Sequence, residues 1–289
     1  MGSALLMIRS IAVIFGVATL VACGGGSSGS SDASAAGVTR SVPVEINFSA
    51  VMGSAALACD VDYTDVGTAA TTTQIKDFRL YVHDIQLVTD ADEVVALTLD
   101  TSDWQAQGVA LLDFENATGE CTGTAETNSA VSGTVPDSGA VFNAVRFTVG
   151  IPQHLNHLEQ VSVSPFNITG MNWGWTNGYK FIRFDVPNWN LHIGATGCAA
   201  GGGGDIECTH SNRPQIALSN FNYQTQRIQI DFGALLQGSD ITTNLGGPSG
   251  CMSGGTDPEC NEVFTQLGLS LVSGENDPGL TQTVFSVAD

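Results

Sequence analysis

Apolar and polar positions alternate along much of the chain after residue 40. Val42, Val44, Ile46 and Phe48 are separated by Pro, Glu and Asn, which is the pattern of a half-buried strand. Similar patterns predict strands over residues 78–88, 93–99, 141–149, 179–186, 215–221, 227–232, 263–271 and 282–287, with the last two as a possible pair. No helical period is sustained, although residues 106–112 leave room for a short turn.

Two long glycine-rich connections, at residues 188–214 and 238–261, interrupt this series of strands. Loops of that length in a compact domain usually carry a function or are disordered, and cysteines within both favour the first reading. We therefore expect an all-β fold: an antiparallel β-sandwich or barrel-like domain with long disulfide-linked loops, formed as a single domain by residues 41–289.

The first residues have the pattern of a bacterial lipoprotein signal. Arg9 precedes an apolar stretch at 11–21, which is too short to span a membrane but suits a signal peptide. The stretch ends in Leu-Val-Ala-Cys at 20–23, which resembles a lipobox and predicts that Cys23 is acylated. Residues 24–40 are rich in Gly, Ser and Ala and predict a flexible tether. Because Gly24 rather than Asp follows the cysteine, we expect an outer-membrane lipoprotein facing the periplasm or the cell surface.

Net charge narrows the range of partners. The chain has 29 acidic and nine basic residues, for a formal charge of −20. Such a surface repels phosphate backbones, so no nucleic-acid partner is expected. It would attract cations or a basic protein, although a solvated acidic surface is also common.

The cysteines predict disulfides. Setting Cys23 aside leaves an even set, as expected of an exported protein. Two local pairs each bracket a glycine-rich loop, and the two remaining cysteines form a long-range pair. The predicted pairs are Cys198 with Cys208, Cys251 with Cys260, and Cys59 with Cys121. A thiolate metal site is the alternative, but no C-x-x-C or zinc-finger spacing supports it.

Most of the residues that could bind a metal or be oxidised lie between residues 150 and 198. His154, His157 and His192 lie there, as do Trp173 and Trp175. Imidazole is a common ligand of copper and zinc. The spacing of His154 and His157 suits a turn or one helical face, and two tryptophans two residues apart would share one face of a strand. The alternative is that each histidine is simply solvated or hydrogen-bonded and that the tryptophans belong to a core.

Motifs of common enzymes are absent from the sequence. It has no G-x-S-x-G, no P-loop, no dinucleotide-binding glycine motif and no C-x-x-C-H for haem. We therefore expect a protein that is not an enzyme.

Several segments, in order, resemble the MbnP-like family of methanobactin-operon copper-binding proteins, also described as four-Cys-motif proteins of metallo-mystery pairs. The best-matching segments include DFRLYVHD at 77–84, FTVGIP at 147–152 and MNWGW at 171–175. The others lie at residues 104–105, 110–115, 121, 155–157, 164–167, 178–181, 192–194 and 197–198. The loop between Cys198 and Cys208 extends the family pattern.

The resemblance implies copper, as Cu(I), and a partner. Relatives are encoded beside a di-haem c-type protein of the cytochrome c peroxidase or MauG type, which oxidises a Trp to kynurenine. The new aromatic amine then joins histidine nitrogens around the metal. Carried onto this chain, His157 and His192 are the expected ligands, with His83 and His154 in reserve. Trp173 and Trp175 are the candidates for oxidation.

Two other functions remain open at this point. A surface lipoprotein could use the Trp-rich loop as a metal-independent protein-interaction module. A metal-dependent redox enzyme would need an open coordination position, for which no base or second ligand set is evident.

Overall fold

The structure is a computed structural model that describes residues 40–158, 162–174, 176–201 and 205–289. The predicted signal peptide, Cys23, most of the tether and Trp175 lie outside these residues. Among the helices of the described part, none is long and apolar enough to cross a membrane.

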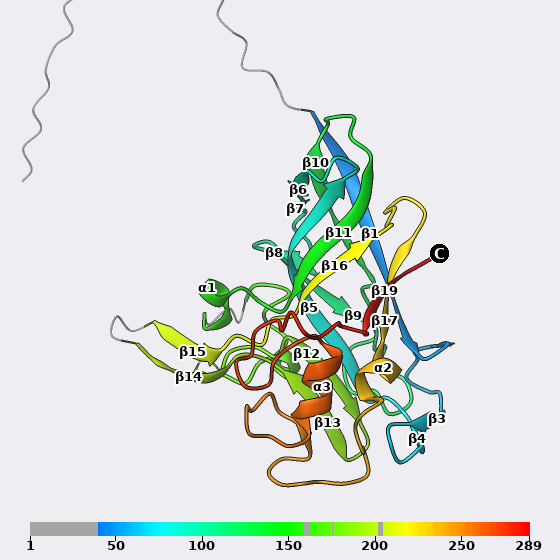
Figure 1. Ribbon diagram of the computed structural model, residues 1–289, viewed down its shortest axis with the longest axis vertical. Coiled ribbons are helices and arrows are strands. Elements are labelled where there is room, and N and C mark those ends of the chain that lie inside the picture. The colour runs from blue at the N-terminus through cyan, green and yellow to red at the C-terminus, as the bar shows by residue number, and fades with distance from the viewer. Residues whose placement is uncertain (1–39, 159–161, 175, 202–204) are drawn as a thin grey trace, which may run out of the picture. The chain divides into compact units, whose positions relative to one another are not determined.

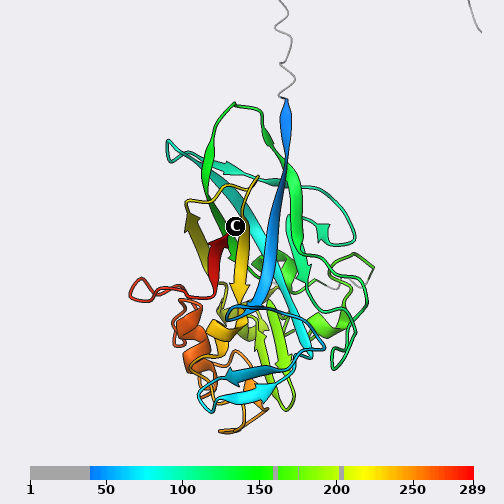
Figure 2. The same cartoon turned by 90° about the vertical axis from the view of Figure 1, so that its right-hand side faces the viewer.

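Two sheets pack face to face into a sandwich (Figure 1). The smaller has the order β19-β17-β1-β10-β7, with β2 beside β1. Its strands are β1 (Ser41–Met52), β2 (Ala55–Ala56), β7 (Thr98–Leu99), β10 (Ala130–Pro136), β17 (Arg227–Asp231) and β19 (Phe285–Ala288). Figure 2 shows β1, in blue, running beside the strands that carry the C-terminus.

The larger sheet has the order β16-β11-β5-β12-β13-β18, extended by β6, β9 and β8. Its strands are β5 (Asp77–Thr89), β6 (Val94–Ala96), β8 (Gln105–Ala106), β9 (Val109–Asp113), β11 (Phe142–Val149), β12 (Ile182–Val186), β13 (Trp189–Ile193), β16 (Gln215–Ser219) and β18 (Gly250–Cys251). Two small ribbons pair β3 (Tyr63–Val66) with β4 (Thr71–Thr73), and β14 (Thr196–Ala200) with β15 (Ile206–His210). The helices are α1 (Gln153–Asn156), the 3-10 turn η1 (Thr169–Met171), α2 (Phe232–Leu236) and α3 (Cys260–Gln266).

Aromatic side chains fill the space between the two sheets. Phe147 of β11 meets Phe48 of β1 and Phe285 of β19 edge-on, with ring centroids 5.9 and 5.5 Å apart. Phe184 of β12 stacks on Phe232 of α2 at 4.5 Å. Such rings dominate the area buried in a core, so these contacts hold the sheets together.

The outer face of the larger sheet carries a second, smaller core. It contains Tyr81 of β5 together with residues of the segment 151–181, including Phe166, Met171 and Tyr179. Because both faces are covered here, β5 is almost continuously buried from Asp77 to Val82. Most of the residues that the sequence marked for chemistry belong to the segment that covers this face.

The all-β prediction is confirmed, but the sheets are mixed rather than purely antiparallel. β1 pairs with β17 in parallel, and β13 pairs with β18 in parallel. Both pairings join strands that are far apart in the sequence, where no local pattern reveals strand direction. The predicted strand at 93–99 divides into β6 and β7, which join different sheets.

One predicted strand and its predicted pairing were wrong. The first part of the predicted strand at 263–271 is helical and belongs to α3. Cys260, Val263, Phe264 and Leu267 are all buried, and their spacing of three and four residues is helical. The predicted pairing with the last strand is therefore also wrong, since β19 pairs with β17. The short turn expected within 106–112 is present and joins β8 to β9 in a hairpin.

Candidate functional site

Trp173 is presented by a short hairpin on the outer face of the larger sheet. Its backbone N–H donates to the Gly178 carbonyl at 2.9 Å, and Asn172 bridges to Tyr179. Asn156, which is fully buried, accepts a hydrogen bond from the Tyr179 N–H at 3.0 Å. Gly178 has φ +74°, and a Cβ there would collide with the Asn156 side chain. The glycine and the asparagine together fix the position of the hairpin.

His192 lies on β13 beside this tryptophan. The two ring centroids are 6.2 Å apart and tilted by 57°. A Cβ added at Gly194 would meet the benzo ring of Trp173, so the indole rests directly on this strand. The His192 Nε2 lies 2.8 Å from Asp185 Oδ1. Because a carboxylate accepts, this bond selects the neutral tautomer with the proton on Nε2 and the lone pair on Nδ1 whenever the imidazole is neutral.

Asp185 is the end of a buried ladder of charges across β5 and β12. Arg183 donates to Asp185 at 2.7 Å and approaches Asp77 at 2.9 Å, and Arg79 pairs with Asp77. Burial would raise the pKa of Asp185, but the hydrogen bond from His192 and the nearby positive charges outweigh it and lower that pKa. The carboxylate that orients His192 is therefore ionised at neutral pH.

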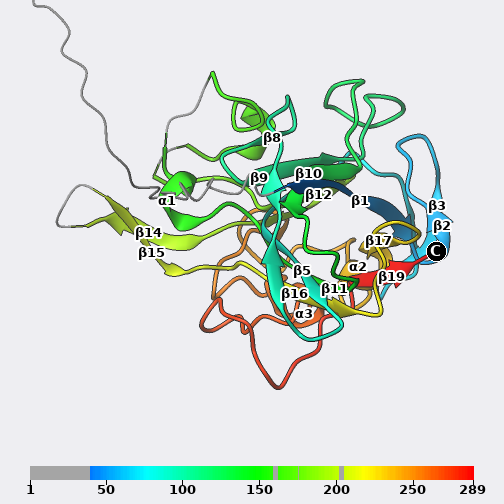
Figure 3. The ribbon, with the colours of Figure 1, turned by 90° about the horizontal axis from the view of Figure 1, so that it is seen from above.

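His157 lies at the C-terminal end of α1, against the ribbon β14–β15. Its Nε2 is 3.0 Å from the Asn156 amide nitrogen and 3.2 Å from Cys208 Sγ. Figures 1 and 3 show α1 beside the ribbon, and Gln153 donates to the Ile206 carbonyl at 3.0 Å. The nitrogen of His157 and the sulfurs of Cys198 and Cys208 all lie within 4.8 Å of one another.

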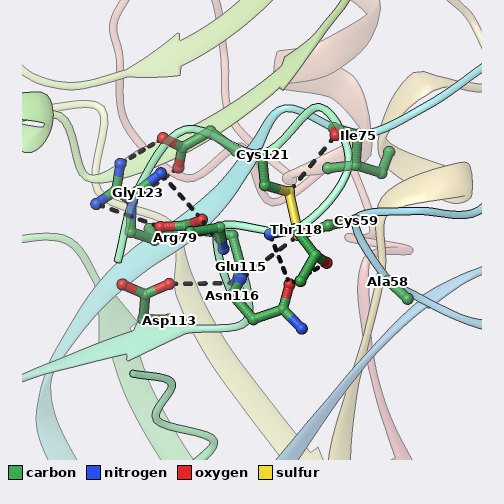
Figure 4. Close-up of a disulfide and its surroundings, with 12 residues drawn as sticks. Ala58, Cys59, Ile75, Arg79, Asp113, Glu115, Asn116, Thr118, Cys121 and Gly123 are labelled. Atoms are coloured by element: carbon green, nitrogen blue, oxygen red, sulfur yellow. Dashed lines mark hydrogen bonds and ion pairs between the residues drawn. A yellow bond between two sulfur atoms is a disulfide. The ribbon is translucent and has the colours of Figure 1, made fainter. Parts of the chain in front are cut away.

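Those two sulfurs are joined in a disulfide, so they are not thiolate ligands. The structure contains all three predicted disulfides: Cys59–Cys121, Cys198–Cys208 and Cys251–Cys260. The first lies beside the fully buried Glu115, whose carboxylate accepts backbone N–H bonds of 3.0–3.1 Å from Ala117, Gly123 and Thr124 (Figure 4). This second group of sulfur and carboxylate atoms is a structural brace and leaves no free ligand.

A pocket of about 360 Å³ joins the two halves of the site. Trp173 lines one part of it, and Cys198, which neighbours His157, lines another. Met252 and Thr196 also contribute. Among the described residues, no group of three close His, Cys, Asp or Glu ligand atoms includes both His157 and His192. Neither His157 nor His192 is a lining residue of the pocket. Each lies against one, Cys198 and Trp173 respectively, and the two histidines do not form a closed ligand cluster.

The reserve histidines lie away from Trp173, one on β5 and one on α1. His83 of β5 donates from Nδ1 to the Gly150 carbonyl at 2.8 Å. Burial lowers its pKa, and the charges of Arg213 and His154 lower it further. His154 is exposed on α1, close enough to contribute that effect. Neither histidine lines the Trp173 pocket.

Two residues of the site were missed by the sequence reasoning. Asp185 could have been found, because Arg183 and Asp185 place charges on alternate positions of an otherwise apolar strand. Met252 could not, because it reaches the pocket only through the parallel pairing of β13 with β18.

The fold and site define a disulfide-braced β-sandwich with a tryptophan-lined pocket that has a histidine beside the tryptophan. A model of the MbnP family matches residues 41–253, so the chain belongs to this family. Among solved structures it is similar to MbnP from Methylosinus trichosporium, with a TM-score of 0.77 and 29% sequence identity. The similarity covers 86% of this chain and 98% of that one. Comparison with curated proteins gives no match. Membership supports a metal-related role, for which copper is the expected ion.

Proposed function

We propose that this chain is an exported, lipid-anchored copper-binding protein. The observation that carries the proposal is the contact between Trp173 and His192, 6.2 Å between ring centroids, in a member of the MbnP family. An aromatic side chain that can be converted into an amine ligand then lies beside an imidazole whose Nδ1 lone pair is not used by Asp185.

The residues present suit copper chemically. Imidazole nitrogen is a good copper ligand, and a carboxylate on the other ring nitrogen fixes the orientation of the imidazole and raises its basicity. Asp185 fills that role for His192. In the proposed site His192 and His157 hold Cu(I), which accepts few ligands. His83 and His154 remain reserve ligands, since His83 is hydrogen-bonded to the Gly150 carbonyl and His154 is exposed on α1.

Trp173 supplies the third ligand only after oxidation. Indole nitrogen is a poor donor because its lone pair belongs to the ring π system. Addition of two oxygen atoms from two molecules of hydrogen peroxide would cleave the C2–C3 bond and release two waters. Hydrolysis of the resulting formyl group then frees the aromatic amine and formate. The proposed catalyst is a separate di-haem MauG-like partner, so this chain is substrate rather than enzyme. Trp175 is the rival position.

The proposed anchor is a lipid on Cys23, with the tether holding the domain outside the outer membrane or in the periplasm. The acidic chain, with a net charge of −20, would attract cations toward the pocket. The proposed role is therefore to capture or hold copper in the cell envelope.

Histidine substitutions test the proposal. We expect His157→Ala with His192→Ala to abolish stoichiometric binding of Cu(I), measured by competition with a chromophoric chelator under reducing conditions. His210→Ala is the matched control, because its ring is hydrogen-bonded to Thr209 and to the Val272 carbonyl outside the pocket. Unchanged affinity in the double variant would refute the site. Binding of a protein partner that survives chelation, without any copper, would favour the interaction module.

A further inference from the structure

Met252 lies on the same face of the sheet as His192. In the parallel pairing of β13 with β18, Leu191 is aligned with Cys251. Both of these side chains belong to the core between the sheets. Because side chains alternate along a strand, the next residue of each, His192 and Met252, points to the opposite face. Both are half-buried.

Ser253 continues this alignment beyond the last strand pair. Its hydroxyl donates to the His192 carbonyl at 2.7 Å and accepts from the Gly194 N–H at 2.8 Å. The Met252 N–H donates to Asp257 Oδ2 at 2.9 Å. The backbone on both sides of Met252 is therefore fixed, and its side chain is held beside the segment that carries His192.

The Met252 side chain lines the pocket of about 360 Å³ that Trp173 also lines. Trp173 in turn contacts His192. A thioether and the oxidisable indole thus line one pocket, and the His192 imidazole lies against that indole on the outer face of the larger sheet. A thioether is a soft ligand that favours Cu(I), whereas oxygen ligands favour hard cations.

We propose that the Met252 thioether is a further copper ligand of the proposed site at Trp173 and His192 and gives the site its preference for Cu(I). This inference rests on the proposed copper function. It adds a sulfur donor from a segment that only the β13–β18 pairing brings to the site. If Met252 merely fills space in the pocket, a leucine at this position should leave copper binding unchanged.

The test uses the full exported chain labelled with selenomethionine and loaded with Cu(I). Copper X-ray absorption should show scattering from one selenium neighbour. That signal should disappear in Met252→Leu and persist in Met52→Leu, a matched control because Met52 is buried at the end of β1. Leucine has nearly the volume of methionine, so both variants should fold.

Affinity gives a second readout. Loss of even an outer partner of a ligand weakens metal binding by about 10–100-fold, so Met252→Leu should weaken Cu(I) binding by roughly tenfold or more. Met252→His should retain copper but shift its preference toward Cu(II).

Three outcomes are distinguishable. Selenium scattering that depends on Met252, with weakened Cu(I) binding in Met252→Leu, supports the inference. Copper bound by the parent without selenium scattering, and with equal affinity in the two leucine variants, overturns the inference and leaves the copper function standing. A parent chain that takes up no copper, even after co-production with the di-haem partner, overturns both.

Discussion

Asp113 is the buried carboxyl group that should most clearly make the free energy of unfolding depend on pH. It ends β9, aligned with Arg79 of β5, and is 1% exposed. One carboxyl oxygen accepts the Glu115 N–H at 3.2 Å, and the other has no hydrogen-bond partner among the described residues. Burial raises its pKa to about 8, opposed by Arg79 and reinforced by Glu115 and Asp77. At neutral pH the folded protein therefore holds this group as the neutral acid.

Because the pKa of Asp113 is raised on folding, the free energy of unfolding should decrease as the pH rises. Below about pH 4 the group is protonated in both states, and its contribution to stability is fully present. As the pH rises toward 8, the unfolded chain ionises while the folded protein does not, so the free energy of unfolding falls. Each factor of ten in proton affinity is worth about 1.4 kcal/mol. With a folded pKa of about 8, the loss has an upper limit of about 4 kcal/mol by pH 7 and about 5 kcal/mol by pH 8.

Asp113→Asn should remove this loss, because an amide resembles the neutral acid in shape and does not ionise. Urea unfolding at pH 5, 7 and 8.5, with disulfides intact and tryptophan fluorescence as the signal, would measure the difference. We expect the variant to gain stability over the parent by several kcal/mol between pH 5 and 8.5. Asp103→Asn, at an exposed position, is the control and should show no such trend. A difference between variant and parent that does not change with pH would refute the reasoning.

The remaining predictions concern the disulfides and the tryptophan. Replacing Cys59 and Cys121 by serine opens a loop with a sequence separation of 62 and should cost about 4 kcal/mol, against about 3 kcal/mol for Cys198 and Cys208 with a separation of 10. Urea unfolding would check the order, and a larger cost for the short loop would contradict the entropic argument. Co-production with the di-haem partner should change the mass of the peptide that carries Trp173, and production alone should not. An unmodified peptide from the native organism would refute the maturation proposal.

Local patterns predicted most of the strands because burial on a sheet imposes a period of two. The pattern at Val42, Val44 and Ile46 is the buried face of β1. The disulfide pairs were also accessible, because two of them close short loops. The helix α3 was not, since Val263 and Phe264 fit a short apolar strand as well as a helix.

The site was only partly predictable. The region of Trp173 and His192 was marked by its chemistry and by the family resemblance. Asp185 reaches His192 across the local hairpin of β12 and β13, but β13 lies in the stretch that was predicted to be a long loop. Met252 arrives through the long-range pairing of β13 with β18. The alternating charges of β12 are a signal for Asp185, whereas nothing local in the sequence specifies that the distant strands β13 and β18 pair.

Copper titration of the full exported chain under reducing conditions tests the central claim most directly, with elemental analysis of the purified protein before and after co-production with the di-haem partner. We predict close to one tightly held copper per chain, selected over zinc and lost in the His157→Ala and His192→Ala double variant. Absence of stoichiometric copper in both preparations, or equal copper in the double variant, would contradict the account.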